Sequence, residues 1–369
     1  MRALALIAPA LLAGCGACSD QGSPGAWWAG RSTAVRAILE QLSQLEGTPL
    51  ARRARQLAQT LPECESVGVH APDGDIARLA EGVRCLAPGD PLEAALRGAD
   101  RDLVFALPSA GGGPLRGVLR IDDTVLVVDL RWQEPRTCGA LGLLVPGEEL
   151  AGPDRLASAG RLVHLRVRPR DGLDLAALIP ADSQADRLFR LRSGILAGAV
   201  LDGTWEGAVY LPERAGGMPG AAIALGFSLR SAAVAAAERF VADLQETWPV
   251  SRSDLHLAGG DGACLADLNV LPDLAPCYVA TTDALVFGWN PASLERALAG
   301  AMMTVPDAAG RLDVNLALIE RADDLLAHHF TGSERPLAWP WSRLVASGGS
   351  DGDALVLRLK LVAARRSAS

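Results

Sequence analysis

Three stretches of the chain share a pattern in which two runs of alternating apolar residues flank a short turn rich in Asp and Gly. A period of two places the apolar side chains on one face of a strand. Asp-Gly between such runs predicts a hairpin, because Gly adopts positive φ at little cost. The three stretches are Leu115–Trp132 with its turn at Asp122-Asp123, Leu196–Leu211 with its turn at Leu201-Asp202-Gly203, and Leu344–Val362 with its turn at Ser350-Asp351-Gly352-Asp353. The pattern predicts a hairpin-rich antiparallel sheet, and a weak internal repeat of these hairpins remains an open alternative.

Several other segments show the helical spacing of apolar residues. Thr48-Pro49 and Asn290-Pro291 each supply an N-cap followed by a first-turn proline. Helices are expected at 35–45, 48–61, 74–83, 231–248 and 290–300. Strands are expected at 66–70, 221–229, 277–281 and 284–289 as well as in the hairpins. This mixture predicts an α+β fold, with helices packed on antiparallel sheets.

The N-terminal segment has the order of charge, apolar run and small residues that export signals share. Arg2 is followed by an apolar run to Leu12, and Ala13 and Gly14 then lead into Cys15. The tetrad Leu12-Ala13-Gly14-Cys15 resembles the lipobox of bacterial lipoproteins. A plain secretory signal cut at another bond and an uncleaved apolar N-terminus are the alternatives.

The resemblance implies a specific processing of the chain. Residues 1–14 would be removed, and Cys15 would carry a diacylglycerol on its thiol and an acyl chain on its new amino group. Two or three acyl chains give stable membrane attachment, whereas one chain binds only reversibly. Gly16, in place of Asp, favours the outer membrane by the same resemblance, facing the periplasm or the cell surface. The order of elements in the body also resembles that of envelope lipoproteins carrying domains of unknown function.

The expected organisation follows from these features and from Gly- and Pro-rich breaks. We expect a signal peptide at 1–14, a lipidated tether at 15–31, a helical and then hairpin-rich region at 32–150, and a C-terminal α+β region at 151–369. Trp27 and Trp28 lie at the end of the expected tether. They would either sit at the lipid headgroups or pack against the folded body.

Seven cysteines in an exported chain indicate disulfides, and setting Cys15 aside for lipid leaves an even six. Two local pairs are predicted, Cys64 with Cys85 and Cys264 with Cys277. Cys18 and Cys138 would either pair with each other or remain free thiols. With Cys15 set aside for lipid, the remaining six cysteines show no CxxC spacing, which disfavours redox chemistry and zinc binding by these cysteines.

One strand-like segment, 161–170, places basic residues at alternate positions. His164, Arg166, Arg168 and Arg170 fall on one face, opposite an apolar face that contains Leu165. A basic face on a chain of net charge −8 is a candidate surface for an anion or an acidic partner. The alternative is a solvent-exposed face paired with nearby carboxylates.

No catalytic constellation is recognisable in the sequence. A GxSxG elbow, a phosphate-binding loop, a dinucleotide-binding glycine pattern and an HExxH motif are all missing, and the five histidines are scattered. The sequence therefore predicts no enzyme, no metal site and no cofactor beyond the lipid on Cys15. Nucleic acid is disfavoured as a partner, because its binding depends on Lys and Arg neutralising phosphates.

The function expected from the sequence is that of a membrane-anchored cell-envelope lipoprotein with a non-catalytic binding or structural role. Its partners would be the membrane and either an envelope protein or a lipid. A periplasmic carrier of lipid or another hydrophobic ligand is the first alternative. An envelope enzyme without a recognisable motif is the second.

Overall fold

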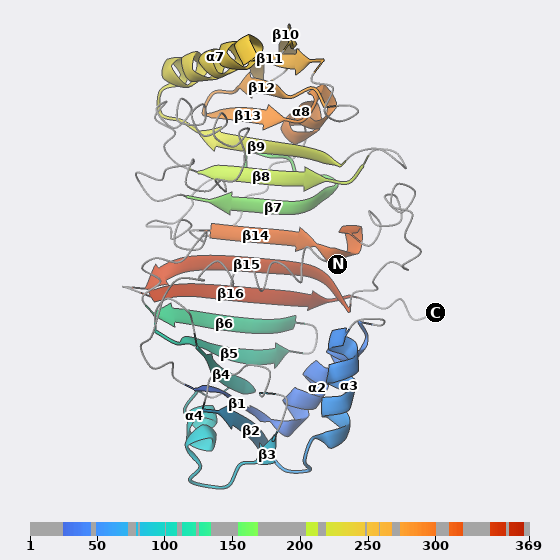
Figure 1. Ribbon diagram of the computed structural model, residues 1–369, viewed down its shortest axis with the longest axis vertical. Helices are drawn as coiled ribbons and strands as arrows, with labels where there is room; N and C mark the ends of the chain where they lie inside the picture. The colour runs from blue at the N-terminus through green and yellow to red at the C-terminus, as the bar shows by residue number, and fades with distance from the viewer. Residues whose placement is uncertain are drawn as a thin grey trace. The chain divides into compact units, whose positions relative to one another are not determined.

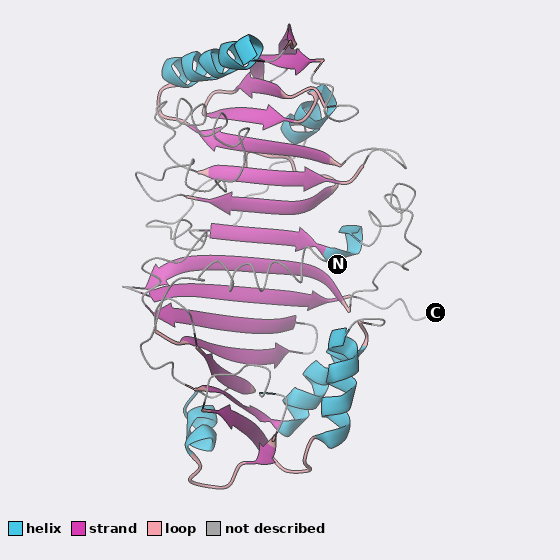
Figure 2. Cartoon of the chain, viewed as in Figure 1, coloured by secondary structure: helices cyan, strands magenta, loops and turns pink. Residues whose placement is uncertain are grey.

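The computed structural model assigns the chain to the α+β class, with antiparallel sheets and packed helices (Figures 1 and 2). It describes residues 25–45, 49–72, 79, 82–99, 101–108, 113–122, 125–133, 154–168, 204–212, 219–247, 249–257, 259–267, 274–299, 310–319, 340–351 and 354–364. The chain divides into two compact units. The first unit combines Met1–Val145 with Ser333–Ser369, and the second is Pro146–Gly332.

The sheet of the first unit is antiparallel throughout its described pairs, in the order β3-β2-β1-β4-β5-β6-β16-β15. Its strands are β1 (Ala26–Arg31), β2 (Ser66–Ala71), β3 (Arg84–Cys85), β4 (Leu103–Leu107), β5 (Leu115–Asp122), β6 (Val125–Gln133), β15 (Trp341–Asp351) and β16 (Ala354–Ala363). The hairpins β5–β6 and β15–β16 confirm two of the three predicted hairpins.

Helices cover both faces of this sheet beside β1. The described helices are α2 (Ser32–Ser43), α3 (Pro49–Thr60) and α4 (Pro91–Ala99). The adjacent residues Trp27 and Trp28 point to opposite faces of β1. Trp28 packs with α2 and α3, and Trp27 packs with α4. Strand β1 thus occupies the end of the predicted tether, and the two tryptophans pack in the folded body rather than at the headgroups.

The C-terminal hairpin belongs to the first unit, which corrects the predicted C-terminal region at 151–369. Strand β16 pairs with β6 along nine residue pairs, from Ala354 opposite Gln133 to Val362 opposite Val125. Strand β16 provides backbone hydrogen-bond partners for the edge of β6 and extends the apolar face of the sheet. Sequence patterns do not show which distant strand will fill such an edge, because backbone hydrogen bonds are the same for every residue type.

The second unit contains an antiparallel sheet in the order β10-β11-β12-β13-β9-β8-β7-β14. Its strands are β7 (Arg161–Val167), β8 (Trp205–Tyr210), β9 (Gly220–Gly226), β10 (Ser251–Leu257), β11 (Gly260–Ala266), β12 (Cys277–Ala280), β13 (Ala284–Gly288) and β14 (Gly310–Asn315). Both edges of β8 are taken, by β7 and β9. The predicted hairpin at Leu196–Leu211 is therefore wrong in its pairing, although its outgoing strand is real; residues 196–203 lie outside the described part.

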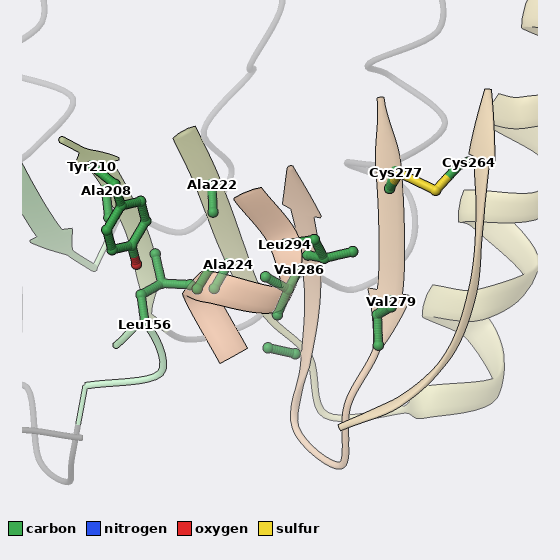
Figure 3. Close-up of a cluster of buried hydrophobic side chains, with 12 residues drawn as sticks. Leu156, Ala208, Tyr210, Ala222, Ala224, Cys264, Cys277, Val279, Val286 and Leu294 are labelled. Atoms are coloured by element: carbon green, nitrogen blue, oxygen red, sulfur yellow. A yellow bond between two sulfur atoms is a disulfide. The ribbon is translucent and has the colours of Figure 1, made fainter. Parts of the chain in front are cut away.

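Alternating side chains give this sheet two separate cores. On one face, α8 (Pro291–Leu298) packs against Ala224, Val279 and Val286 (Figure 3). On the other face, α7 (Arg230–Thr247) packs through Ala233, Ala237 and Val241 against strands that include β11 and β12. Helix α8 begins at the predicted cap, where the Asn290 Oδ1 atom accepts a hydrogen bond of 2.8 Å from the Ser293 backbone N–H.

Both predicted disulfides are formed in the structure. Cys64 and Cys85 tie β3 to the segment before β2, and Cys264 and Cys277 are register partners on β11 and β12. The second bridge lies in the core beneath α8 (Figure 3). Cys18 and Cys138 lie outside the described residues, so their pairing stays open.

Candidate functional site

Five charged or ionisable side chains lie buried together at one end of the second unit. We name them the buried charged cluster: Asp154, Arg161, His164, Arg166 and Glu206. Asp154 belongs to the segment before β7, Glu206 lies on β8, and the other three lie on β7. Each of the five residues is at most 8 % exposed. Burying charge costs free energy unless the charges are paired, so the pairing decides what this site can do.

The sheet register brings the members of the cluster to one face. Arg166 lies opposite Glu206, and His164 lies opposite Ala208, on the β7–β8 pair. Glu206, Ala208 and Tyr210 alternate along β8, and the last two belong to the core beneath α8. The charged cluster is therefore the polar end of that same core.

Asp154 carries two guanidinium partners. Its Oδ2 atom accepts hydrogen bonds from Arg161 at 3.2 and 3.3 Å, and its Oδ1 atom accepts one from Arg166 Nη1 at 3.3 Å. Arg161 also donates to the Leu156 carbonyl oxygen at 3.3 Å. These contacts tie the segment before β7 to the face of the strand.

Glu206 is held mainly by backbone donors. The Arg155 backbone N–H donates to both carboxylate oxygens, at 3.0 and 2.8 Å, and the Leu156 N–H donates to Oε2 at 3.2 Å. Arg166 Nε lies 3.6 Å from Oε1. This carboxylate therefore has a fixed orientation in the interior.

His164 lies between the two carboxylates and is completely buried. Its Nδ1 atom is 3.9 Å from Asp154 Oδ2, and its Nε2 atom is 3.5 Å from Glu206 Oε2. Within the described part of the chain, neither ring nitrogen makes a hydrogen bond. A buried polar group left in this state costs about 1–3 kcal/mol, so this imidazole requires an explanation.

Strand β14 extends the charged face with two more buried or half-buried groups. Asp313 lies opposite His164, and Arg311 lies opposite Arg166. The Arg311 Nη2 atom donates to Asp313 Oδ2 at 2.9 Å. The carboxylates of Asp154, Glu206 and Asp313 thus lie beside the guanidinium groups of Arg161, Arg166 and Arg311 on one face of the sheet.

Tyr210 forms the boundary between the charged cluster and the apolar core. Its hydroxyl donates a hydrogen bond of 3.2 Å to the Ala157 carbonyl oxygen, and the Arg296 guanidinium lies 5.4 Å from the centre of its ring. Burial disfavours the phenolate and raises the pKa of Tyr210 to about 12. Tyr210 therefore stays neutral and holds the 154–157 segment against the sheet.

The predicted basic surface is turned inward, which corrects its proposed role as an anion- or partner-binding face. His164 and Arg166 are buried, Arg168 is half-buried, and Arg170 lies outside the described residues. The opposite face is the more open one, since Leu165 is 37 % exposed. The period of two was correct, but ion pairing with Asp154 and Glu206 allows the charged side to be the interior side.

The other predicted site residues fall into two groups. Leu12, Ala13, Gly14 and Cys15 lie outside the described residues. Cys64, Cys85, Cys264 and Cys277 form the two disulfides far from the charged cluster in sequence.

Sequence reasoning missed the acidic half of the cluster. Asp154 stands alone in an irregular segment, and Glu206 is a single charge in the strand Trp205–Tyr210. An isolated carboxylate at an otherwise apolar face position of a strand was the available signal. It pointed to a buried partner, but the partner's identity depends on which strand lies alongside.

The arrangement limits the chemistry that the site can perform. A general base must reach a substrate, whereas His164 has no exposed surface. One ligand atom each from Asp154, His164 and Glu206 lies within 4.8 Å of the others, which is a grouping able to hold a metal ion. The cluster is therefore an interior grouping of ligand atoms that is able to hold an ion, and its side chains are closed off from solvent.

The fold and the site define an α+β protein with a buried charged cluster in its second unit. No protein-family model, curated protein or solved structure matches the chain. None of the helices in the described ranges combines the length and the apolar character needed to cross a membrane.

Proposed function

We propose that this chain is a lipid-anchored protein of the bacterial cell envelope, with a non-catalytic binding or structural role. The observation that carries the proposal is the tetrad Leu12-Ala13-Gly14-Cys15 after a charged and apolar leader. The two disulfides support it, because disulfides persist in oxidising compartments such as the periplasm.

The anchor has a defined chemistry in this proposal. The Cys15 sulfur forms a thioether to diacylglycerol, and cleavage before Cys15 exposes an amino group that is then acylated. Each buried methylene contributes about 0.8 kcal/mol, so several chains together hold the protein at the membrane. Gly16 favours delivery to the outer membrane, facing the periplasm or the cell surface.

Intact-mass measurement of the mature protein tests this proposal. We expect a chain that starts at Cys15 and carries the added mass of the diacylglycerol and the N-acyl chain. The variant Cys15→Ser should lack this mass and leave the membrane fraction. A wild-type product without acyl chains, or one that starts at another residue, would refute the anchor.

Carrying an apolar ligand is the second candidate function, and one observation on the first unit favours it. Leu119, Val128 and Leu359 are register partners across β5, β6 and β16, and similar apolar rows lie on either side of them. Val128 and Leu359 are half-buried. The opposite face of the same strands carries exposed charges such as Arg358 and Lys360. Such a two-sided sheet fits a carrier of lipid or another hydrophobic ligand.

Native mass spectrometry of the Cys15→Ser protein, purified without detergent, tests the carrier function. A carrier should retain bound lipid. In the same background, Leu359→Asp should lower the lipid occupancy, whereas Lys360→Asp on the opposite face should leave it unchanged. A lipid-free spectrum of the folded parent would contradict the carrier function and leave the anchor proposal standing.

A further inference from the structure

We propose that Asp154, His164 and Glu206 form a binding site for one divalent transition-metal cation, of which Zn²⁺ is the model case. The three residues come from the segment before β7, from β7 and from β8. All three are at most 1 % exposed, and one ligand atom of each lies within 4.8 Å of the others.

The state of the His164 ring is the first argument. Both ring nitrogens are buried, and neither makes a hydrogen bond within the described residues. The nearest carboxylate oxygens, at 3.5 and 3.9 Å, lie beyond the usual hydrogen-bond range of about 2.7–3.2 Å. A proton on either nitrogen therefore does not satisfy the ring in this geometry, whereas a cation would use the nitrogen lone pair.

The spacing is the second argument. Zinc binds imidazole nitrogen and carboxylate oxygen at about 2.0–2.2 Å, which puts neighbouring tetrahedral ligands about 3.4 Å apart. The 3.5 Å between His164 Nε2 and Glu206 Oε2 matches that separation. In the same tetrahedral geometry the widest pair of the three, which lies within 4.8 Å, must approach by up to about 1.4 Å. Asp154 lies on an irregular segment rather than on a strand, so we expect metal binding to shift this residue more than His164 or Glu206.

The surroundings hold the carboxylates as metal ligands are usually held. Glu206 accepts backbone N–H groups of Arg155 and Leu156, and Asp154 accepts from Arg161 and Arg166. Hydrogen bonds of this kind orient ligating carboxylates in known metal sites. Asp154 Oδ1 and Glu206 Oε1 each accept one of these hydrogen bonds, whereas Oδ2 and Oε2 each accept two, so a cation would bind through Oδ1 and Oε1 or replace one hydrogen bond at Oδ2 or Oε2.

The surrounding charges and the ligand types set the affinity of the site and the kind of cation that it prefers. Arg161 and Arg166 place positive charge beside the same carboxylates, so we expect weaker binding than at a closed site of four protein ligands. An imidazole in the set favours a transition metal over Ca²⁺ or Mg²⁺, which prefer oxygen ligands. A bound ion would fasten the 154–157 segment to β7 and β8, which is a structural role.

Zinc titration of the Cys15→Ser chain, with both disulfides intact and after removal of metals by a chelator, tests the site. We expect one zinc per chain by elemental analysis. Glu206→Gln, which keeps the shape and the acceptor oxygen, should weaken binding at least tenfold. His256→Ala is the matched control, because His256 is exposed beside Asp261 in the same unit, and it should bind zinc like the parent.

Two results would overturn the proposal. The first is a parent protein that takes up no zinc above the level of Glu206→Gln. The second is zinc lost equally in His256→Ala, which would indicate an adventitious surface ion. If Glu206→Gln does not fold, Co²⁺ added to the parent gives an independent answer. Intense visible bands of low-coordinate Co²⁺ support the site, and a spectrum of hydrated Co²⁺ alone refutes it.

Discussion

Arg166 on β7 and Glu206 on β8 are register partners, with Nε and Oε1 3.6 Å apart and both side chains almost completely buried. Arg166 also donates to Asp154, so one guanidinium serves two interior carboxylates. Arg166 and Glu206 lie far apart in the sequence. The pairing of β7 with β8 creates the relationship and explains why a basic strand faces inward.

Replacing Arg166 with Met should destabilise the protein strongly. It leaves two carboxylates buried beside one fewer positive charge, and removing one partner of a buried pair costs about 3–5 kcal/mol. Urea unfolding measures this loss. Arg358→Met is the control, because the Arg358–Asp129 pair is largely exposed and such pairs contribute about 0–1 kcal/mol. Equal losses in both variants would contradict the interior role of Arg166.

Removing the bridge between Cys264 and Cys277 should lower the free energy of unfolding by about 2–4 kcal/mol. The bridge joins residues separated by 13 positions, and closing a loop of that size restricts the unfolded chain. The double variant Cys264→Ala and Cys277→Ala fits the buried site, and urea unfolding without reductant measures the change. An unchanged midpoint would show that the bridge does not form in the native protein.

Replacing Asn290 with Ala should cost about 1 kcal/mol. The side chain caps α8 by accepting the Ser293 N–H, and loss of such a cap leaves that donor without its partner. Asn290→Asp keeps the acceptor and should retain most of the stability. Thermal unfolding of the two variants distinguishes loss of the cap from a general effect of substitution. A general effect would lower the unfolding temperature of both variants equally.

Alkaline pH should destabilise the second unit through Tyr210. Burial raises the pKa of its hydroxyl from 10.0 to about 12 in the folded state. The unfolded chain therefore loses the proton first, and the stabilisation that is complete below pH 10 declines as pH rises towards about 12. The loss amounts to about 1–3 kcal/mol.

Unfolding free energies measured between neutral pH and pH 12 test this prediction. Tyr210→Phe should reduce the slope in the alkaline window. The chain has only two tyrosines, and burial and the Glu238 carboxylate also raise the pKa of Tyr278. Tyr278→Phe therefore measures the part of the alkaline slope that Tyr210 does not cause. A slope that neither variant changes would exclude the tyrosines as its source.

Local patterns predicted the elements whose signals lie within a few residues. The apolar stripes of α2 and α3, the Asn290-Pro291 start of α8, and the turns of the hairpins β5–β6 and β15–β16 are all local signals of this kind. The hairpin β10–β11 was missed because Ser251–Leu257 is polar and exposed, which is typical of an edge strand and resembles a loop in sequence.

The sequence by itself determined the α+β class, most of the helices and hairpins, and the two local disulfides, since each depends on contacts between residues close along the chain. The tertiary structure alone decided that the C-terminal hairpin completes the first unit. It also decided that His164 and Arg166 are buried among Asp154 and Glu206. Which strands pair depends on the free edges and the apolar faces of segments that are far apart in the sequence and come together only in the folded chain. A charged side chain can be buried when the neighbouring strand places an opposite charge beside it.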